Sequence, residues 1–267
     1  MPWYNASNFF APPEDGKLRE LYSHYDRVYD ILDQIGNFVE AVINPNVHAL
    51  RKFQNGFIPL PVAIVDGKIM TNGVTYDLHS AEGTFKVFLK GEELHDASLI
   101  LPGTFLADDR IEIAAGVLIE SGAMISGPTI LGPETAVRQG AYVRGNVLTT
   151  SNALIGHATE VKNVIMMDHA KAGHFAYLGD SILGNWVNLG AGTKLANLKM
   201  SSLPFRFTVD GETLIVKRRK FGAILGDGVE TGCNTVTNPG TLLGQNSRVW
   251  PNVTVKAGYH EPLTVIR

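Results

Sequence analysis

Residues 101–143 decide the fold, and divided into sixes they read LPGTFL-ADDRIE-IAAGVL-IESGAM-ISGPTI-LGPETA-VRQGAY-V. Each unit begins with an aliphatic residue or an alanine, from Leu101 to Val143. A helix would space its apolar residues by three and four, and a half-buried strand would space them by two. A step of six instead predicts a short strand followed by a corner, with one apolar side chain pointing inward in each unit.

The repeat continues beyond residue 143, with two steps of five and one interruption. Its inward positions are Ile155, Val161, Met167, Ala172, Leu178, Leu183, Leu189, Leu195, Leu225, Thr231, Thr237, Leu243, Val249 and Val255. Three units make a triangular coil of about 18 residues, and successive coils pair at about 4.8 Å. The sequence therefore predicts an all-β protein, with a parallel β-helix of hexapeptide repeats over residues 101–267 and a loop excursion at 196–221.

Residues 1–100 lack the repeat and form a separate region. Apolar residues at helical spacing over residues 17–43 predict a helix, with Gly36 as a possible break. The pair Asp66-Gly67 predicts a hairpin turn between residues 63–65 and 68–70. The end of a solenoid exposes apolar core and unpaired strand edges. We therefore expect the helix and this small β-rich part to cap the first coil, with a role in assembly as the alternative.

Composition excludes several classes of protein. With 45% hydrophobic and 18% charged residues, the chain of 267 residues is typical of a soluble globular protein. Its net charge of −3 argues against a nucleic-acid partner. The one cysteine, Cys233, allows no internal disulfide and fits a reducing compartment. No signal peptide or membrane-spanning run is recognisable, so we expect a cytoplasmic protein without a membrane partner.

The register of the repeat places a column of side chains at one corner. Equivalent faces recur every three units, so Ile155, Ala172 and Leu189 share a face in successive coils. The residues two places further on are His157, His174 and Ala191. We expect these three to lie in a column, with neighbours about 4.8 Å apart.

The same counting places charged residues together at another position. Arg144 should lie beside Lys162, and Glu160 beside Tyr177, one coil apart. Two stacked cations are unfavourable unless they share an anion, and a phosphate is a suitable anion. The alternative for Arg144 and Lys162 is a solvated basic edge.

The residues around this column resemble a known family. The strings KAGHFAYLGD at residues 171–180 and VNLGAGT at residues 187–193 are similar to the acetyltransferase domain of the bifunctional N-acetylglucosamine-1-phosphate uridylyltransferase/glucosamine-1-phosphate acetyltransferase. Arg144, Glu160 and Lys162 stand at that family's spacing. The likeness covers roughly residues 101–258 and is densest over residues 144–197. It implies a left-handed β-helix, acetyl-CoA as co-substrate, and a homotrimer with active sites where neighbouring chains meet.

The resemblance also implies a role for each matching residue. His174 would be the general base that takes a proton from an attacking amine, because imidazole exchanges protons near neutral pH. The backbone N–H of Ala191 would donate to the thioester oxygen as negative charge develops. The remaining implied contacts are with the sugar phosphate (Arg144 and Lys162), with the sugar (Glu160, Tyr177 and Asn188) and with the cofactor (Cys233 and, by a looser match, Lys220).

Two departures from the family pattern limit what the resemblance implies. Nothing in residues 1–100 resembles the family's nucleotide-binding loop, so we do not expect UTP chemistry. After GAGT the family continues Asn-Tyr-Asp-Gly, whereas this chain continues Ala196-Asn197-Leu198-Lys199 and enters the excursion. The acceptor therefore stays open between a glucosamine 1-phosphate-like sugar phosphate and a nucleotide-linked amino sugar. The basic run KRRK at residues 217–220 is either a solvated loop or a counter-charge for the phosphates of CoA.

Two other functions compete with acetyl transfer. Hexapeptide β-helices also include carbonic anhydrases, which resemble this architecture and bind zinc through three histidines. In this chain His157, His169 and His174 could form such a site across a subunit boundary. We expect no metal, because the surrounding strings match acetyltransferases. The second rival is a non-catalytic β-helix that binds a sugar nucleotide, since a fold does not prove a chemistry.

Overall fold

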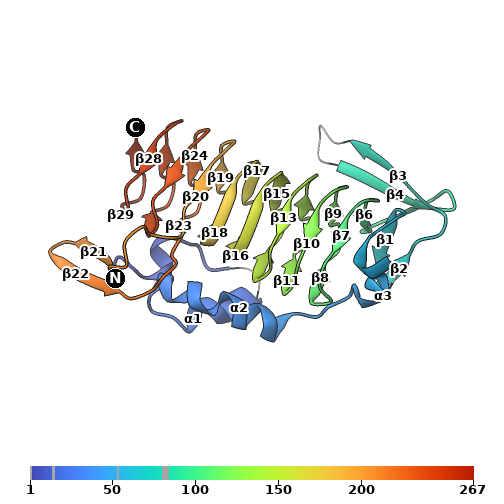
Figure 1. The fold of residues 1–267 in the computed structure, drawn as a ribbon, viewed down its shortest axis with the longest axis horizontal. Helices are drawn as coiled ribbons and strands as arrows, with labels where there is room; N and C mark the ends of the chain where they lie inside the picture. Colours follow the sequence, from blue (N-terminus) through green and yellow to red (C-terminus); the bar gives the residue numbers. More distant parts are fainter. Residues whose placement is uncertain (1, 14–15, 53, 80–83) are drawn as a thin grey trace.

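The computed structural model describes residues 2–13, 16–52, 54–79 and 84–267, and it contains the predicted parallel β-helix (Figure 1). Each coil crosses three faces. The strands of the first face are β6 (Ser98–Ile100), β9 (Leu118–Ile119), β12 (Ala136–Val137), β15 (Leu154–His157), β17 (Lys171–His174), β19 (Asn188–Leu189), β24 (Glu230–Thr231), β27 (Arg248–Val249) and β30 (Val265–Ile266).

The second and third faces share the two long strands β16 (Glu160–Met166) and β18 (Tyr177–Leu183), which bend around the corner between them. The second face otherwise contains β7 (Phe105–Leu106), β10 (Met124–Ile125), β13 (Tyr142–Val143), β20 (Lys194–Leu195), β25 (Val236–Thr237) and β28 (Thr254–Val255). The third face contains β8 (Ile111–Ile113), β11 (Thr129–Leu131), β14 (Val147–Thr149), β23 (Ala223–Leu225), β26 (Thr241–Leu243) and β29 (Gly258–His260).

The inward register matches the hexads. Ile155 pairs with Val137 in the coil before it and with Ala172 in the coil after it, and Ala172 pairs in turn with Leu189. These side chains belong to one buried core that runs the length of the prism. Burying one aliphatic side chain contributes about 1.5–3 kcal/mol. The repeat is therefore held in register chiefly by its interior ladder.

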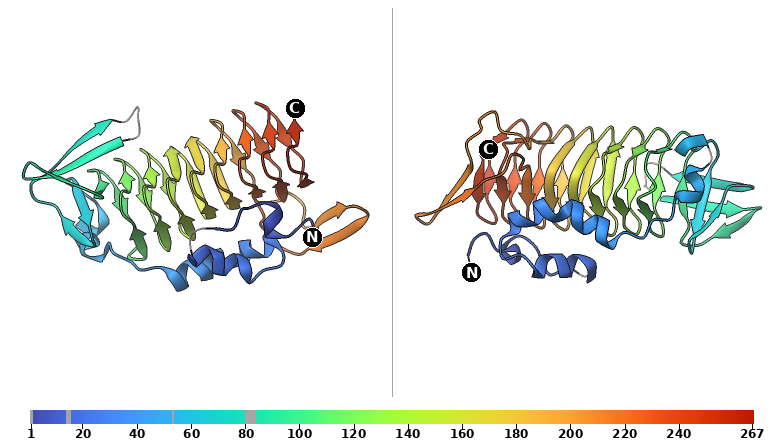
Figure 2. Two further views of the ribbon diagram at one scale, coloured as in Figure 1. Left: turned by 180° about the vertical axis from the view of Figure 1, so that it is seen from behind. Right: turned by 60° about the horizontal axis from the view of Figure 1, so that its bottom comes forward.

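The N-terminal helices lie along the third face rather than over the first coil (Figures 1 and 2). α1 (Gly16–Ser23), η2 (Val28–Asp30) and α2 (Ile31–Val42) follow the short η1 (Ala6–Asn8). The expectation that the helix caps the coil was wrong: α2 packs on the outward-facing aliphatic residues of the third face instead. The possible break at Gly36 does not occur. Gly36 lies inside α2, where an added Cβ would be 2.9 Å from the Asn146 carboxamide, so glycine allows a close approach.

The small β-rich part does lie at the end of the first coil. The predicted hairpin is β1 (Val62–Val65) and β2 (Lys68–Met70), and β1 pairs antiparallel with β6. This pairing covers the strand edge that the first face would otherwise expose. A second sheet of β3 (Val74–His79), β4 (Thr84–Leu89) and β5 (Glu92–Leu94) packs beside it, after α3 (His48–Arg51) and η3 (Gln54–Gly56).

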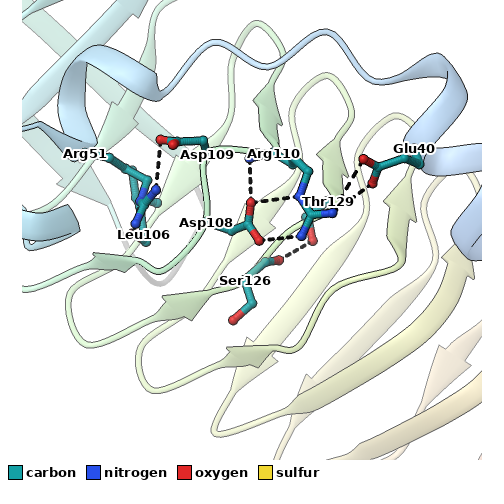
Figure 3. A network of polar contacts seen from close by, with 8 residues as sticks. All are labelled: Glu40, Arg51, Leu106, Asp108, Asp109, Arg110, Ser126 and Thr129. Carbon is teal, nitrogen blue, oxygen red and sulfur yellow. Dashed lines mark hydrogen bonds and ion pairs between the residues drawn. The ribbon is translucent and has the colours of Figure 1, made fainter.

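Ion pairs attach the segment between α2 and α3 to the first coils (Figure 3). Arg110 bonds to Asp108 at 2.7 Å and to Glu40 of α2 at 3.2 Å, while Arg51 pairs with Asp109 at 2.9 Å. Arg110 holds the pKa of Asp108 below its usual range, chiefly through the side-chain hydrogen bond. Most of these groups are partly exposed, and such pairs contribute about 1 kcal/mol or less. They position the segment more than they stabilise the fold.

The excursion at 196–221 is present as predicted and contains a hairpin of β21 (Phe205–Val209) and β22 (Glu212–Val216). Its buried rings Phe205 and Phe207 pack against Phe221, so they join the apolar layer on the third face. A bridge between Leu198 and Lys220 closes its base. Among the described residues, no helix has the length and apolarity needed to span a bilayer.

Candidate active site

The corner between the first and second faces carries the predicted column. His157 pairs with His174, and the register of Ala172 with Leu189 places Ala191 one coil beyond His174. The pairing of Leu189 with Thr231 places Cys233 one coil further still. The order along the corner is thus His157, His174, Ala191 and Cys233.

The two histidines of the column differ in their hydrogen bonds. His157 Nδ1 lies 3.0 Å from the carbonyl oxygen of Gln139. The exposed imidazole of His174 has no hydrogen-bond partner within the described ranges. Its nearest aromatic neighbour is Phe175, with the ring centroids 6.5 Å apart. His174 is therefore the histidine of this pair whose ring nitrogens are both available to a ligand.

The corner also presents a free backbone donor. The neighbours of Ala191 are engaged, because the Gly190 N–H donates to the Thr231 carbonyl and the Gly192 N–H donates to that of His174. The Ala191 N–H has no acceptor in the part of the chain that the structure describes. A free N–H beside a free imidazole can stabilise a developing oxyanion while the imidazole accepts a proton.

The outward positions of the second face lead from this corner to the next. Glu160 pairs with Tyr177, and Tyr177 with Lys194, as the register predicts for the first pair. Lys194 Nζ donates to the carbonyl oxygen of Gly192 at 2.8 Å. Sequence reasoning missed Lys194, because it followed the outward positions of this face only as far as Tyr177.

The corner between the second and third faces collects the cations. Arg144 and Lys162 are neighbours, since Val143 pairs with Val161. Arg144 donates to Glu160 at 2.7 Å, and this hydrogen bond raises the pKa of the guanidinium further. Burial lowers the pKa of Lys162, and the nearby Lys220 and Arg144 lower it more, against the opposing effect of Asp180.

Asn197 connects this corner to the second face, and sequence reasoning did not single it out. Its carboxamide donates to Asp180 at 2.5 Å and accepts from the Tyr177 hydroxyl at 3.4 Å. Asn163 donates to the other oxygen of Asp180 at 3.1 Å. The signal was available in the sequence, because Asn197 is the last residue of the stretch that matches the family.

Three of the predicted site residues, Asn188, Lys220 and Cys233, do not lie together on the second face. Asn188 is on the first face, beside Lys171 and Glu230, across the His174 corner from Glu160. Lys220 lies next to Lys162, whereas Cys233 belongs to the His174 corner. Within one chain, the two residues implied for the cofactor therefore stand at different corners.

The histidines of the rival zinc site are not assembled within one chain. His169 is at the third corner, where its ring stacks on Trp186 with centroids 3.8 Å apart. No group of three His, Cys, Asp or Glu side chains that could hold a metal ion occurs among the residues that the structure describes.

The family model for the GMPPB C-terminal domain matches residues 125–264, more than half of the chain. The chain belongs to this family. The matched stretch of the GMPPB C-terminal domain includes every residue of the two corners described above.

The chain also has relatives that are named as bifunctional proteins. It is 34% identical to a "Bifunctional sugar-1-phosphate nucleotidylyltransferase/acetyltransferase" of Sulfurisphaera tokodaii, over 58% of this chain and 40% of that protein. It is 32% identical to a "Bifunctional protein GlmU" of Methanococcus aeolicus, over 88% of this chain and 56% of that protein. The chain spans about half the length of the curated relatives it matches. The resemblance inferred from residues 171–193 is confirmed by these relatives.

One solved structure also aligns, a Francisella novicida UDP-N-acetylglucosamine acyltransferase. The match covers 59% of this chain and 60% of that chain, with 14% identity and a TM-score of 0.34. A likeness this loose carries no argument about the site.

Proposed function

We propose that the chain is an acetyl-CoA-dependent N-acetyltransferase, with His174 as general base and an amino-sugar phosphate or nucleotide amino sugar as acceptor. The observation that carries the proposal is the free imidazole of His174 one coil from the free N–H of Ala191. The names of the bifunctional relatives support the same reaction class.

In this reaction His174 accepts a proton from the acceptor's amine as the nitrogen bonds to the thioester carbonyl carbon. The Ala191 N–H donates to the carbonyl oxygen, which carries negative charge in the tetrahedral intermediate. When the C–S bond breaks, the imidazolium returns its proton to the departing CoA thiolate. Cys233 lies one coil beyond Ala191, at the end of the corner where the thioester's pantetheine arm would lie.

The second face would hold the acceptor. Arg144 and Lys162 would bind its phosphate, and Arg144 would then exchange its bond to Glu160 for one to the phosphate. Glu160 and Tyr177 would face the sugar from the strands between the two corners. Because both residues project from the second face, the sugar would lie between the phosphate and His174.

The assembly belongs to the same proposal. Asn188 lies on the far side of the His174 corner from the acceptor face, which fits a site shared between neighbouring chains of a homotrimer. Light scattering on the purified protein should give three times the mass of one chain. A monomer at micromolar concentration would contradict the shared site.

The cytoplasmic location expected from the sequence remains a prediction.

The test of function measures CoA release from acetyl-CoA with a panel of amino-sugar phosphates and nucleotide amino sugars. We expect His174→Ala to lower the rate about 100- to 10,000-fold, the usual contribution of a general base. His157→Ala is the matched control, because it removes the neighbouring imidazole of the same column and should keep most of the rate.

Two results would contradict the proposal. One is an equal loss of rate in both histidine variants, with unchanged melting temperatures. The other is a wild-type protein that releases no CoA with any acceptor, which would favour the sugar-nucleotide-binding module instead.

A further inference from the structure

A hollow of 460 Å³ opens beside Lys162, on the side away from His174. Its walls come from α2 and from the base of the excursion, so it is not built by the hexapeptide repeat alone. Residues Asp33, Gly36 and Asn37 of α2 face residues 218–220 across it. Its volume lies in the range of about 300–1,000 Å³ that is usual for small-molecule sites.

The hollow has an excess of unpaired positive charge. Arg218 also lines it, but Arg218 is nearly buried and already donates to Asp33 and to a backbone carbonyl. The other cationic side chains on its walls, Lys162, Arg219 and Lys220, make no ion pair within the described ranges. The Asp180 carboxylate also lines the hollow, where it accepts hydrogen bonds from Asn163 and Asn197 and partly offsets the charge of Lys162. The cations on the walls still outnumber the carboxylates, and such an excess on one concave surface favours a polyanionic ligand.

Lys162 has a cationic neighbour both in the preceding coil and in the excursion. These neighbours are Arg144 on the acceptor face and Lys220 at the hollow, and both depress the pKa of Lys162 in addition to burial. Placing like charges together costs free energy in the empty protein unless an anion lies between them. One phosphate between Arg144 and Lys162 would leave only the nearby Asp180 carboxylate to offset the repulsion between Lys162 and Lys220.

We propose that the acceptor binds through two consecutive phosphates and is a nucleoside-diphosphate-linked amino sugar. This inference rests on the proposed acetyl transfer and selects one of its two acceptor classes. The phosphate next to the sugar lies between Arg144 and Lys162, and the second lies between Lys162 and Lys220. The nucleoside occupies the hollow, where Leu32 offers an apolar wall and the carboxamides of Asn37 and Asn146 can donate and accept hydrogen bonds.

Binding measurements without acetyl-CoA test this placement directly. We expect calorimetry on the wild-type protein to show at least about 10-fold tighter binding of UDP or GDP than of UMP or GMP, because a hydrogen bond between charged groups is worth at least that factor. Pyrophosphate should likewise bind more tightly than inorganic phosphate. Lys220→Ala should lower the affinity for the diphosphates about 10-fold and the affinity for the monophosphates about twofold or less.

Lys217→Ala is the matched control, since Lys217 belongs to the same basic run but lines a different hollow. It should leave both affinities unchanged. Lys220→Met, which keeps most of the length of the side chain without the charge, should reproduce the loss seen with Lys220→Ala.

The inference is overturned if diphosphates and monophosphates bind within twofold of each other, or if Lys220→Ala weakens both equally. The same measurements distinguish a failure of the second phosphate site from a failure of the proposed acetyl transfer. Diphosphate-selective binding without CoA release would keep the hollow as a nucleotide site and reject the transferase. CoA release with sugar 1-phosphates alone would keep the transferase and reject the second phosphate.

Discussion

The second and third faces of the β-helix are built from the same repeat, yet their outer sides have opposite chemistry. Alternate residues of a strand point to opposite sides of a sheet, so each strand has one outward position for each inward one. On the third face, from β11 to β26, these outward residues are aliphatic and at most 6% exposed: Ile130, Leu148, Ile165, Ile182, Ile224 and Leu242. On the second face, from β13 to β20, they are Tyr142, Glu160, Tyr177 and Lys194, which are partly or fully exposed.

The difference shows which positions decide function in this fold. Inward residues specify the prism and are alike on all faces. The outward residues decide whether a face binds the chain's own helices or stays open to solvent. The third face is covered by α1, α2 and the aromatic side chains around them, whereas the second face presents polar side chains to solvent between the His174 corner and the cationic corner. Three sets of variants test this contrast between the two faces.

The largest effect on stability is expected from the covered face. Ile165→Ala removes a fully buried side chain from the layer that contains α2, so we expect a loss of about 2–5 kcal/mol in the free energy of unfolding. Tyr142→Ala changes an outward residue of the open face that is 39% exposed, and should cost about 1 kcal/mol or less. Urea unfolding of both variants measures the difference. Equal shifts would show that the helices do not stabilise the third face.

A smaller effect is expected where the two faces meet. Asn197→Ala removes a donor from the buried Asp180 and the acceptor of the Tyr177 hydroxyl. Since Tyr177 faces the acceptor, we expect the KM for the acceptor to rise about 10-fold with a lesser change in kcat. Asn238→Ala, at the same corner beyond the excursion, is the control. If kcat fell and KM did not, Asn197 would serve the chemical step rather than the position of Tyr177.

The smallest effect is a shift in pH dependence at Lys162. Its folded-state pKa is lower than the ordinary lysine value of 10.5, through burial first and then Lys220. Phosphate binding needs the charged ammonium, so affinity for inorganic phosphate should decline with rising pH sooner than for an ordinary lysine. Lys220→Ala should move this decline to higher pH, as followed by calorimetry across the alkaline range.

The lowered pKa of Lys162 also affects folding, but here the free energy of unfolding rises with pH where the phosphate affinity falls. The folded protein releases the Lys162 proton before the unfolded chain does, so the free energy of unfolding should rise between the lowered pKa and 10.5. Lys162→Met should abolish this rise. An alkaline decline in phosphate affinity that Lys220→Ala left unmoved would show that Lys220 does not contribute to the lowered pKa of Lys162.

Much of the site could be predicted because the repeat is periodic. Counting from Ile155 to Ala172 and Leu189 places His174 beside Ala191, and counting from Val143 to Val161 places Arg144 beside Lys162. Each of these relations depends only on a uniform coil and on which residue points inward. The hairpin at Asp66-Gly67 was equally predictable, since its turn is local in the sequence.

The prism, its register and the column at the His174 corner were therefore predictable from the amino-acid sequence, because they follow from a step that the chain repeats. The position of α2 on the third face and the return of Lys220 to Lys162 became clear only from the folded chain. The excursion has no period to count, and the resting place of the helix depends on apolar surface assembled from six separate coils. Such long-range packing is a property of the folded chain as a whole, and no local pattern encodes it.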